Sequence, residues 1–203
     1  MDKFLSYTSQ VVPLQRKDVD TDQIIPAQYL TSVSREGYGQ NLFRRLKDTD
    51  ANFPLNLPQY RGAKILVTDS NFGCGSSREH AVWALQGAGF KAIVGKSFAD
   101  IFSGNSTKNG LLLVELPAEV IEGIFSLAKA GACSLTIDLE KQEVSLPDGG
   151  AQSFRYDPFR KHCLLNGLDD IDYLLSKKKA IDEYRSKHEH TRFFSTVQGV
   201  SSV

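Results

Sequence analysis

The sequence contains few cysteines, and they lie far apart. Cys74, Cys133 and Cys163 are the three, and no two of them form a Cys-x-x-Cys pair. This odd, sparse set argues against a disulfide framework and favours a reducing compartment, so we expect a cytoplasmic protein. It also argues against a structural zinc or an iron–sulfur cluster held by this chain alone, because such centres need closely spaced thiolates. We therefore expect no metal site on this chain.

Other features are absent as well. Lys plus Arg equals Asp plus Glu at 24 each, so no overall field favours nucleic acid or an anionic membrane as a partner. No apolar run reaches the roughly 20 residues that span a bilayer. The first residues contain no apolar core followed by a small-residue cleavage site, so we expect no secretory signal. With 41% hydrophobic and 24% charged residues, the composition is that of an ordinary globular protein.

Strand-like and helix-like stretches alternate in the middle of the chain. Short apolar runs lie at 64–69, 92–94 and 111–114, and apolar residues recur at helical spacing at 78–89 and from Pro117 to Gly131, with a helical turn at 98–102. A further strand is expected at 5–14. This alternation predicts an α/β fold with a parallel or mixed sheet and flanking helices.

The remaining segments have other patterns. Beyond Gly131 the hydrophobic period falls to two, which predicts antiparallel strands at 135–139, 144–146 and 154–156, followed by a helix at 168–184. The mixed stretch at 27–58 reads as a long excursion with one helix at 39–47, and such excursions are often functional. We predict a single domain over residues 1–193 and a disordered tail at 194–203.

The loop Gly73-Cys74-Gly75-Ser76-Ser77-Arg78 carries the strongest chemical signal. It lies between a predicted strand and a predicted helix. Its glycines let the backbone approach a ligand closely, and the helix presents free N–H groups and the positive end of its dipole. Arg78, placed in the first helical turn, is unfavourable for that dipole unless an anion binds there. A guanidinium grips a carboxylate at two points, so the loop predicts a carboxylate site.

Three other interpretations fit parts of this loop. Ser76 and Glu79 are spaced as a capping box, and the local pattern alone favours capping over catalysis for Ser76. Gly73-x-Gly75 before a helix resembles a dinucleotide loop, but Arg78 replaces the third glycine and would block close packing. A nucleophile elbow, Gly-x-Ser-x-Gly, is absent from the loop. Capping therefore stays open, and the other two are disfavoured.

The loop and three other segments together resemble one family. NFGCGSSREHA at 71–81 is similar to the signature of the swivelling domain of the aconitase superfamily. More narrowly, the chain resembles the small subunits of 3-isopropylmalate dehydratases over nearly its whole length. DTDQIIP at 20–26 matches the early active-site loop of that family. KSFADIF at 96–102, NGLL at 109–112 and CLLNGLDDI at 163–171 follow in the expected order.

This resemblance implies a fold and a reaction. The fold is a swivelling β/β/α domain with a mixed sheet, flanking helices and antiparallel strands. The reaction is a dehydration and rehydration that moves a hydroxyl group between adjacent carbons of a carboxylic acid, here in leucine biosynthesis. The partner is a large subunit whose [4Fe–4S] cluster acts as a Lewis acid on that hydroxyl. By matching positions, Ser76 would be the catalytic base, Ser77 and Arg78 would bind a carboxylate of a small dicarboxylate substrate, and Thr21 and Asp22 would line the site.

A base of this kind needs a positive environment, since a serine hydroxyl ionises reluctantly. The helix N-terminus, nearby N–H groups and Arg78 would together supply it. Ser76 cannot cap the helix tightly and also reach a substrate proton. A sharply turned loop whose backbone caps the helix would remove this conflict.

Substrate choice is expected to depend on the stretch after Pro26. Leu30 lies where relatives that use tricarboxylates are expected to carry a cation, so an apolar isopropyl group fits better than a third carboxylate. Core packing is an equally good explanation of Tyr29 and Leu30. The alternatives left open are a related hydro-lyase subunit acting on homoaconitate, citraconate or dimethylmalate, and a carboxylate-binding module without chemistry of its own.

Overall fold

A computed structural model of the chain describes residues 1–30, 35–131 and 133–188. The chain divides into two compact units, residues 1–169 and 170–203, and each is described by itself. The predicted tail at 194–203 lies outside the described residues. The single domain predicted over 1–193 stays a prediction.

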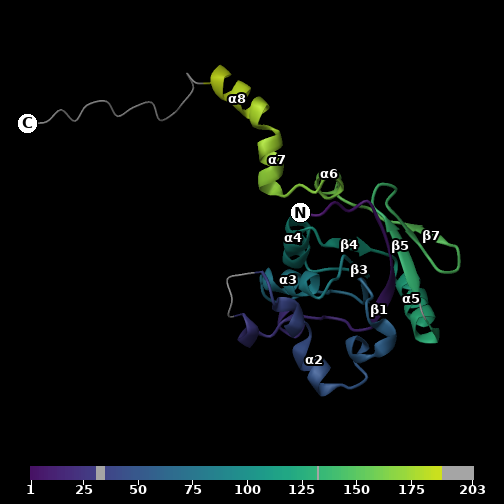
Figure 1. Ribbon diagram of the computed structural model, residues 1–203. Coiled ribbons are helices and arrows are strands. Elements are labelled where there is room, and N and C mark those ends of the chain that lie inside the picture. Colours follow the sequence, from purple (N-terminus) through teal and green to yellow (C-terminus); the bar gives the residue numbers. More distant parts are fainter. Residues whose placement is uncertain (31–34, 132, 189–203) are drawn as a thin grey trace, which may run out of the picture. The chain divides into compact units, whose positions relative to one another are not determined.

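The first unit is built on one seven-stranded mixed sheet with the strand order β4-β3-β2-β1-β5-β6-β7 (Figure 1). The strands are β1 Ser6–Leu14, β2 Ile65–Thr68, β3 Ala92–Gly95, β4 Leu112–Glu115, β5 Ser134–Asp138, β6 Glu143–Ser145 and β7 Ala151–Ser153. The first four pair in parallel, and β5 to β7 form an antiparallel meander. The predicted α/β class is therefore confirmed.

Strand β1 joins the two halves of the sheet. Its last residues, from Val11 to Leu14, pair in parallel with β2, whereas Ser6 to Gln10 pair antiparallel with β5. The buried part of β1 is the part that adjoins the parallel half. The loop that follows Leu14 therefore leaves the same edge of the sheet as the loops after β2 and β3.

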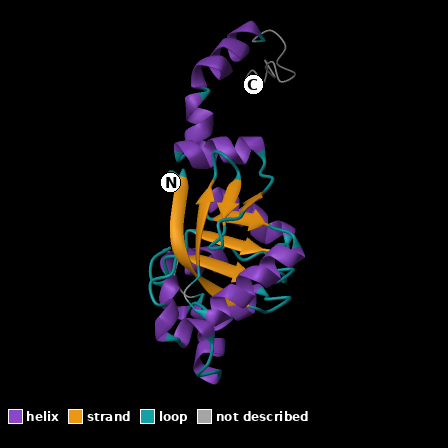
Figure 2. Cartoon of the chain, turned by 90° about the vertical axis from the view of Figure 1, so that its right-hand side faces the viewer, coloured by secondary structure: helices purple, strands orange, loops and turns teal. Residues whose placement is uncertain are grey.

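Figure 2 shows helices packed against the sheet. Side chains of the parallel strands alternate between two cores, one on each face of the sheet. Leu66 belongs to one core, while Ile65 and Val67 belong to the other. The first core receives buried residues from α3 His80–Gly87 and α4 Asp100–Asn109. The second receives those of α5 Ala118–Ala130, together with Leu164 of α6 Pro158–Asn166. Both faces of the parallel half are thus covered, as parallel sheets require.

The excursion between β1 and β2 consists of short helical pieces. They are α1 Thr21–Ile24, η1 Ala27–Tyr29, η2 Tyr38–Asn41, α2 Arg44–Thr49, η3 Pro54–Asn56 and η4 Pro58–Tyr60. The single helix predicted at 39–47 is wrong, because Phe43 adopts a left-handed conformation (φ 51°) that separates η2 from α2. Phe43 is fully buried, so core packing holds this unfavourable backbone in place.

Three more elements differ from what the sequence predicted. The turn expected at 98–102 is the start of the ten-residue helix α4, which the pattern missed because two of its three buried residues, Ser106 and Asn109, are polar. Strand β7 begins at Ala151 rather than 154, since the turn that links Leu146 to Gly150 sets the pairing. Helix α6 was not predicted, although the Asp157 side chain caps it at the Arg160 N–H.

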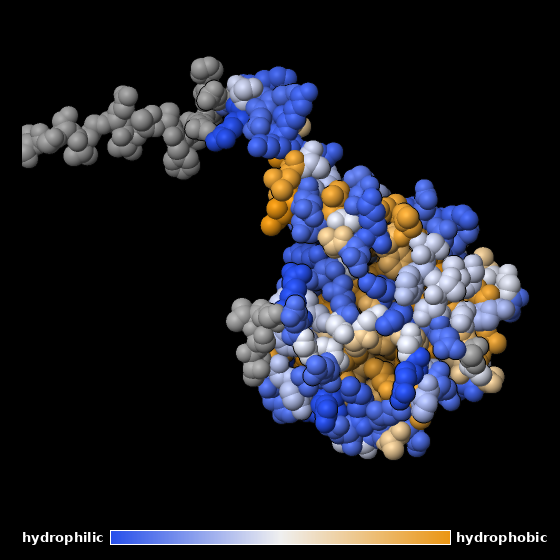
Figure 3. Space-filling view, viewed as in Figure 1, coloured by the Kyte–Doolittle hydropathy of each residue, from blue (hydrophilic) through white to orange (hydrophobic). Residues whose placement is uncertain are grey.

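The second unit contains two short helices, α7 Asp170–Ser176 and α8 Lys178–Lys187. The continuous helix predicted at 168–184 is interrupted at Lys177. Ile171, Leu174 and Leu175 are exposed on α7, where they form an apolar patch (Figure 3). Among the described residues, no helix combines the length and apolarity needed to cross a bilayer.

Candidate active site

The loops that follow β1, β2 and β3 meet at the carboxyl edge of the parallel strands. The N–H of Gly73 donates to the carbonyl of Val19 at 2.7 Å, and the N–H of Thr21 donates to the carbonyl of Cys74 at 2.9 Å. On the other side, Phe72 exchanges backbone hydrogen bonds with the loop after β3, at Ser97 and Ala99. The glycine loop after β2 is therefore held between its two neighbours. Ligands of open α/β sheets commonly bind at this edge.

Two glycines of the loop are required by geometry. Gly73 (φ 80°) and Gly75 (φ 91°) both have positive φ, which L side chains rarely adopt. A Cβ at Gly73 would in addition collide with the ring of Phe102, which lies beneath the loop. Both glycines are therefore needed for the backbone path of this loop, and their close approach to a ligand stays a prediction.

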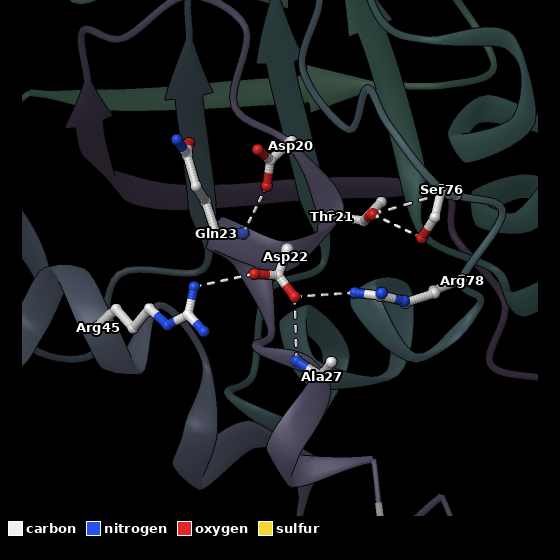
Figure 4. A network of polar contacts seen from close by, with 8 residues as sticks. All are labelled: Asp20, Thr21, Asp22, Gln23, Ala27, Arg45, Ser76 and Arg78. Carbon is white, nitrogen blue, oxygen red and sulfur yellow. Dashed lines mark hydrogen bonds and ion pairs between the residues drawn. The ribbon is translucent and has the colours of Figure 1, made fainter.

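Ser76 lies on the exposed side of this loop, next to Thr21 (Figure 4). Its Oγ is 3.1 Å from the Thr21 Oγ1, and the same Thr21 hydroxyl also lies 3.4 Å from the Ser76 carbonyl oxygen. Thr21 is 3% exposed, so it holds Ser76 from the protein side while the outer side of Ser76 stays accessible.

The capping box predicted for Ser76 and Glu79 is wrong. Helix α3 begins at His80, four residues after Ser76, and no side chain caps its first turn. The Glu79 carboxylate instead accepts a hydrogen bond from Asn109 at 2.6 Å. The turn at Gly75 delays the helix, so the conflict between capping and catalysis does not arise for Ser76. Arg78 likewise precedes α3 and does not lie in its first turn.

Asp22 connects Arg78 to a second arginine. Its Oδ1 accepts from Arg78 Nη1 and its Oδ2 from Arg45 Nη1, each at 3.0 Å (Figure 4). The hydrogen bond from the Ala27 N–H, followed by that from Arg78, lowers the pKa of Asp22 below its usual range. The charged Asp22 carboxylate fixes the direction of the Arg78 guanidinium. An anionic substrate would be repelled by Asp22 itself, so this carboxylate is placed to orient Arg78.

The two remaining predicted site residues are Ser77 and Leu30. Ser77 is exposed, and its carbonyl accepts a hydrogen bond from Asn105 at 3.3 Å. Leu30 follows η1, is partly buried and packs against the first core. The structure thus brings Thr21, Asp22, Ser76 and Arg78 together, and Ser77 adjoins them by sequence. The substrate contact assigned to Leu30 stays a prediction.

Three residues near the site were missed by the sequence reasoning. Arg45 comes from α2, and Asn105 and Asn109 come from α4. An arginine in a mixed polar stretch gives no pattern, so Arg45 could not have been found. Asn109 lies in one of the family-like segments, which was a usable signal.

The cysteines do not form a metal centre in the described part of the chain. All three are free, and no group of three or more His, Cys, Asp or Glu side chains among the described residues is placed to hold a metal ion. Burial, followed by the nearby Asp20 and Asp18 carboxylates, raises the pKa of Cys74, which disfavours the thiolate form that a cluster needs. These residues do not fit an iron–sulfur cluster.

Comparison with known proteins gives consistent matches. The family model for the aconitase C-terminal domain matches residues 1–119, and a model described as LeuD_N matches residues 122–158. The 3-isopropylmalate dehydratase small subunit of Afipia carboxidovorans is 50% identical over 198 residues, covering 95% of this chain and 98% of that relative. The subunit of the same name from Francisella tularensis subsp. novicida is 49% identical over 184 residues, covering 91% of this chain and 97% of that relative.

A solved structure supports the same family. The crystal structure of a 3-isopropylmalate dehydratase chain from Methanocaldococcus jannaschii matches with a TM-score of 0.66 at 28% identity, covering 89% of this chain and 99% of that chain. The predicted family and the predicted aconitase-type fold are both confirmed by these matches.

Proposed function

The chain belongs to the family of 3-isopropylmalate dehydratase small subunits, and we propose that it works as such a subunit in leucine biosynthesis. With an iron–sulfur large subunit, in a heterodimer, it interconverts 2-isopropylmalate and 3-isopropylmalate through isopropylmaleate. The observation that carries this proposal is that one glycine loop holds both an exposed Ser76 and an Arg78 guanidinium that is oriented by Asp22.

Arg78 provides the grip for a substrate carboxylate. One nitrogen of its guanidinium is engaged by Asp22 at 3.0 Å, which leaves its other N–H groups for a carboxylate. The Arg78 side chain is 31% exposed, so it is accessible yet held in one direction. Ser77 adjoins Arg78 in the same loop and is exposed, and we propose that its hydroxyl donates to the same carboxylate.

Ser76 is the proton acceptor in this proposal. As an alkoxide it removes the proton from the carbon next to the carboxylate bound by Arg78, while the hydroxyl leaves the adjacent carbon and a double bond forms. In the rehydration step the proton and the hydroxyl return to exchanged carbons, so the isomerisation is balanced. The positive charge of Arg78 lowers the cost of ionising Ser76. When the Thr21 hydroxyl donates across the 3.1 Å contact, it stabilises the developing alkoxide as well.

The partner supplies the remaining chemistry. A [4Fe–4S] cluster, held by the large subunit in this family, supplies a Lewis acid for the departing hydroxyl group. We place that cluster on the partner because the described cysteines of this chain do not form a ligand set. The small dicarboxylate would then be bound between the two subunits, and neither nucleic acid nor a membrane is needed as a partner.

Among substrates of this type we propose isopropylmalate. Leu30 is apolar and only partly buried, and an isopropyl group needs such a surface. The runner-up is a subunit for a related acid such as homoaconitate, citraconate or dimethylmalate. Another open class is a carboxylate-binding module that performs no chemistry.

Reconstitution tests the proposal. The chain is purified alone and mixed with its large subunit carrying a rebuilt cluster, and formation of isopropylmaleate is followed by its alkene absorbance. We expect no activity from either subunit alone, and saturation of the rate as this chain is added. The proposed function would be rejected if the isolated chain were active. It would also be rejected if the mixture were inactive on isopropylmalate but active on another acid.

A further inference from the structure

Helix α4 lies behind the glycine loop and contacts the loop and the residue that follows it, Glu79, at three places. Phe102 packs beneath Gly73, the Asn105 amide donates to the Ser77 carbonyl at 3.3 Å, and the Asn109 amide donates to the Glu79 carboxylate at 2.6 Å. The three contacting residues share one face of the helix, since they follow one another at intervals of three and four.

The Asn109 side chain is hydrogen-bonded at both ends of its amide. Its amide nitrogen donates to Glu79 Oε1 at 2.6 Å and to the Asn105 carbonyl at 2.8 Å, and its amide oxygen accepts from Trp83 Nε1 at 3.0 Å. Asn109 is 8% exposed. A buried amide with two donor bonds and one acceptor bond has a fixed orientation, because rotating it would leave buried groups unpaired.

These bonds have two different consequences. The bond from Trp83 Nε1 to the Asn109 amide oxygen joins α4 to α3, as does the bond from Gln86 to the Asn109 backbone carbonyl, and neither involves the loop. The bond to Glu79 is different, because Glu79 directly follows Arg78 and is the last residue before α3. It fixes the chain at the point where the exposed loop enters the helix. The outer side of Ser76 and Ser77 is exposed, so the loop is held only from the protein side.

We propose that Asn109 is a positioning residue for the reaction: through Glu79 it sets where the Ser76–Arg78 segment stands relative to the substrate. This inference rests on the proposed function of that segment. Asn109 touches no reacting atom, so its effect passes through the loop. A misplacement of about 1 Å at reacting groups can cost about 100-fold in rate.

Exchanging donor and acceptor across the Glu79–Asn109 pair tests the proposal. Asn109→Asp sets two carboxylates against each other, whereas Glu79→Gln keeps an oxygen that accepts from Asn109. The double variant restores a bond of reversed polarity, in which the introduced amide donates to the introduced carboxylate. In the assembled enzyme we expect kcat to fall at least about tenfold in Asn109→Asp, to change less than about threefold in Glu79→Gln, and to recover at least about threefold in the double variant.

Ile121→Ala serves as the control for a general loss of stability, because Ile121 is fully buried in the second core, away from the loop. Its melting temperature should fall while kcat stays at the wild-type value. If Asn109→Asp behaves like this control, or if adding Glu79→Gln does not improve it, Asn109 is a packing residue and the inference is overturned. An inactive wild-type complex would instead count against the proposed function, so the two failures are distinguishable.

Discussion

Replacing Arg78 by lysine separates the shape of the cation from its charge. One guanidinium nitrogen of Arg78 binds Asp22 at 3.0 Å, and the other nitrogens remain for a two-point contact with a carboxylate. Lysine keeps the charge but has a single ammonium group, so one charge-assisted hydrogen bond to the substrate is lost. Such a bond contributes about 1.5–3 kcal/mol, which corresponds to a KM increase of about 10-fold to 150-fold.

The effect on folding should be much smaller. The Arg78 and Asp22 side chains are 31% and 38% exposed, and an ion pair of this exposure contributes about 1 kcal/mol or less. For a chain of this size the melting temperature should therefore fall by only about 2–4 °C. The assay is the measurement of kcat and KM for isopropylmalate in the assembled enzyme, together with a thermal melt.

Arg45→Lys is the matched control. Arg45 binds the other oxygen of the same carboxylate at the same distance, but its side chain is 60% exposed and lies on α2. We expect its KM to change by less than about fivefold, since only the pair with Asp22 is altered. The reasoning is refuted if Arg78→Lys leaves KM at the wild-type value, or if the two arginine variants have equal effects.

Two further predictions concern Leu30 and Asp22. Leu30→Arg should weaken isopropylmalate use and improve homoaconitate use, within the about 1–3 kcal/mol that one apolar contact provides; an unchanged preference in a substrate comparison would make Leu30 a packing residue. Asp22→Asn should destabilise the chain by about 1 kcal/mol or less at pH 7. The pKa of Asp22 is lowered in the folded chain, so its contribution is present above the unfolded pKa, about 4, and is lost as the pH falls through the lower folded pKa. The free energies of unfolding of the wild type and of Asp22→Asn, measured by denaturation, should therefore converge below about pH 4. A difference between the two proteins that stays constant there would contradict the ion-pair explanation.

Much of the fold followed from periodicity. The apolar runs that became β2, β3 and β4 were predictable because both faces of a parallel sheet are buried. Helix α5 was predictable from its apolar face between Pro117 and Gly131. Helix α4 was underestimated because its inward face is partly polar, and two of its polar residues, Asn105 and Asn109, hydrogen-bond to Ser77 and Glu79.

The site was only partly predictable. The glycine loop indicated an anion site, and the resemblance indicated which serine and arginine to expect. The delayed start of α3 could not be deduced, because the spacing of Ser76 and Glu79 is also that of a capping box. The contacts of Asp22 with Arg45 and Arg78 depend on the fold of the segment between β1 and β2, where the hydrophobic pattern is weakest.

The most direct test of the central claim is the turnover of Ser76→Ala in the assembled enzyme. The change removes one hydrogen bond, to Thr21, so stability should fall by about 1 kcal/mol and assembly should be normal. If Ser76 is the base, kcat should fall by about 100-fold to 10,000-fold. A kcat within about tenfold of wild type, at normal folding and assembly, would contradict the account, because that is below the usual contribution of a catalytic base.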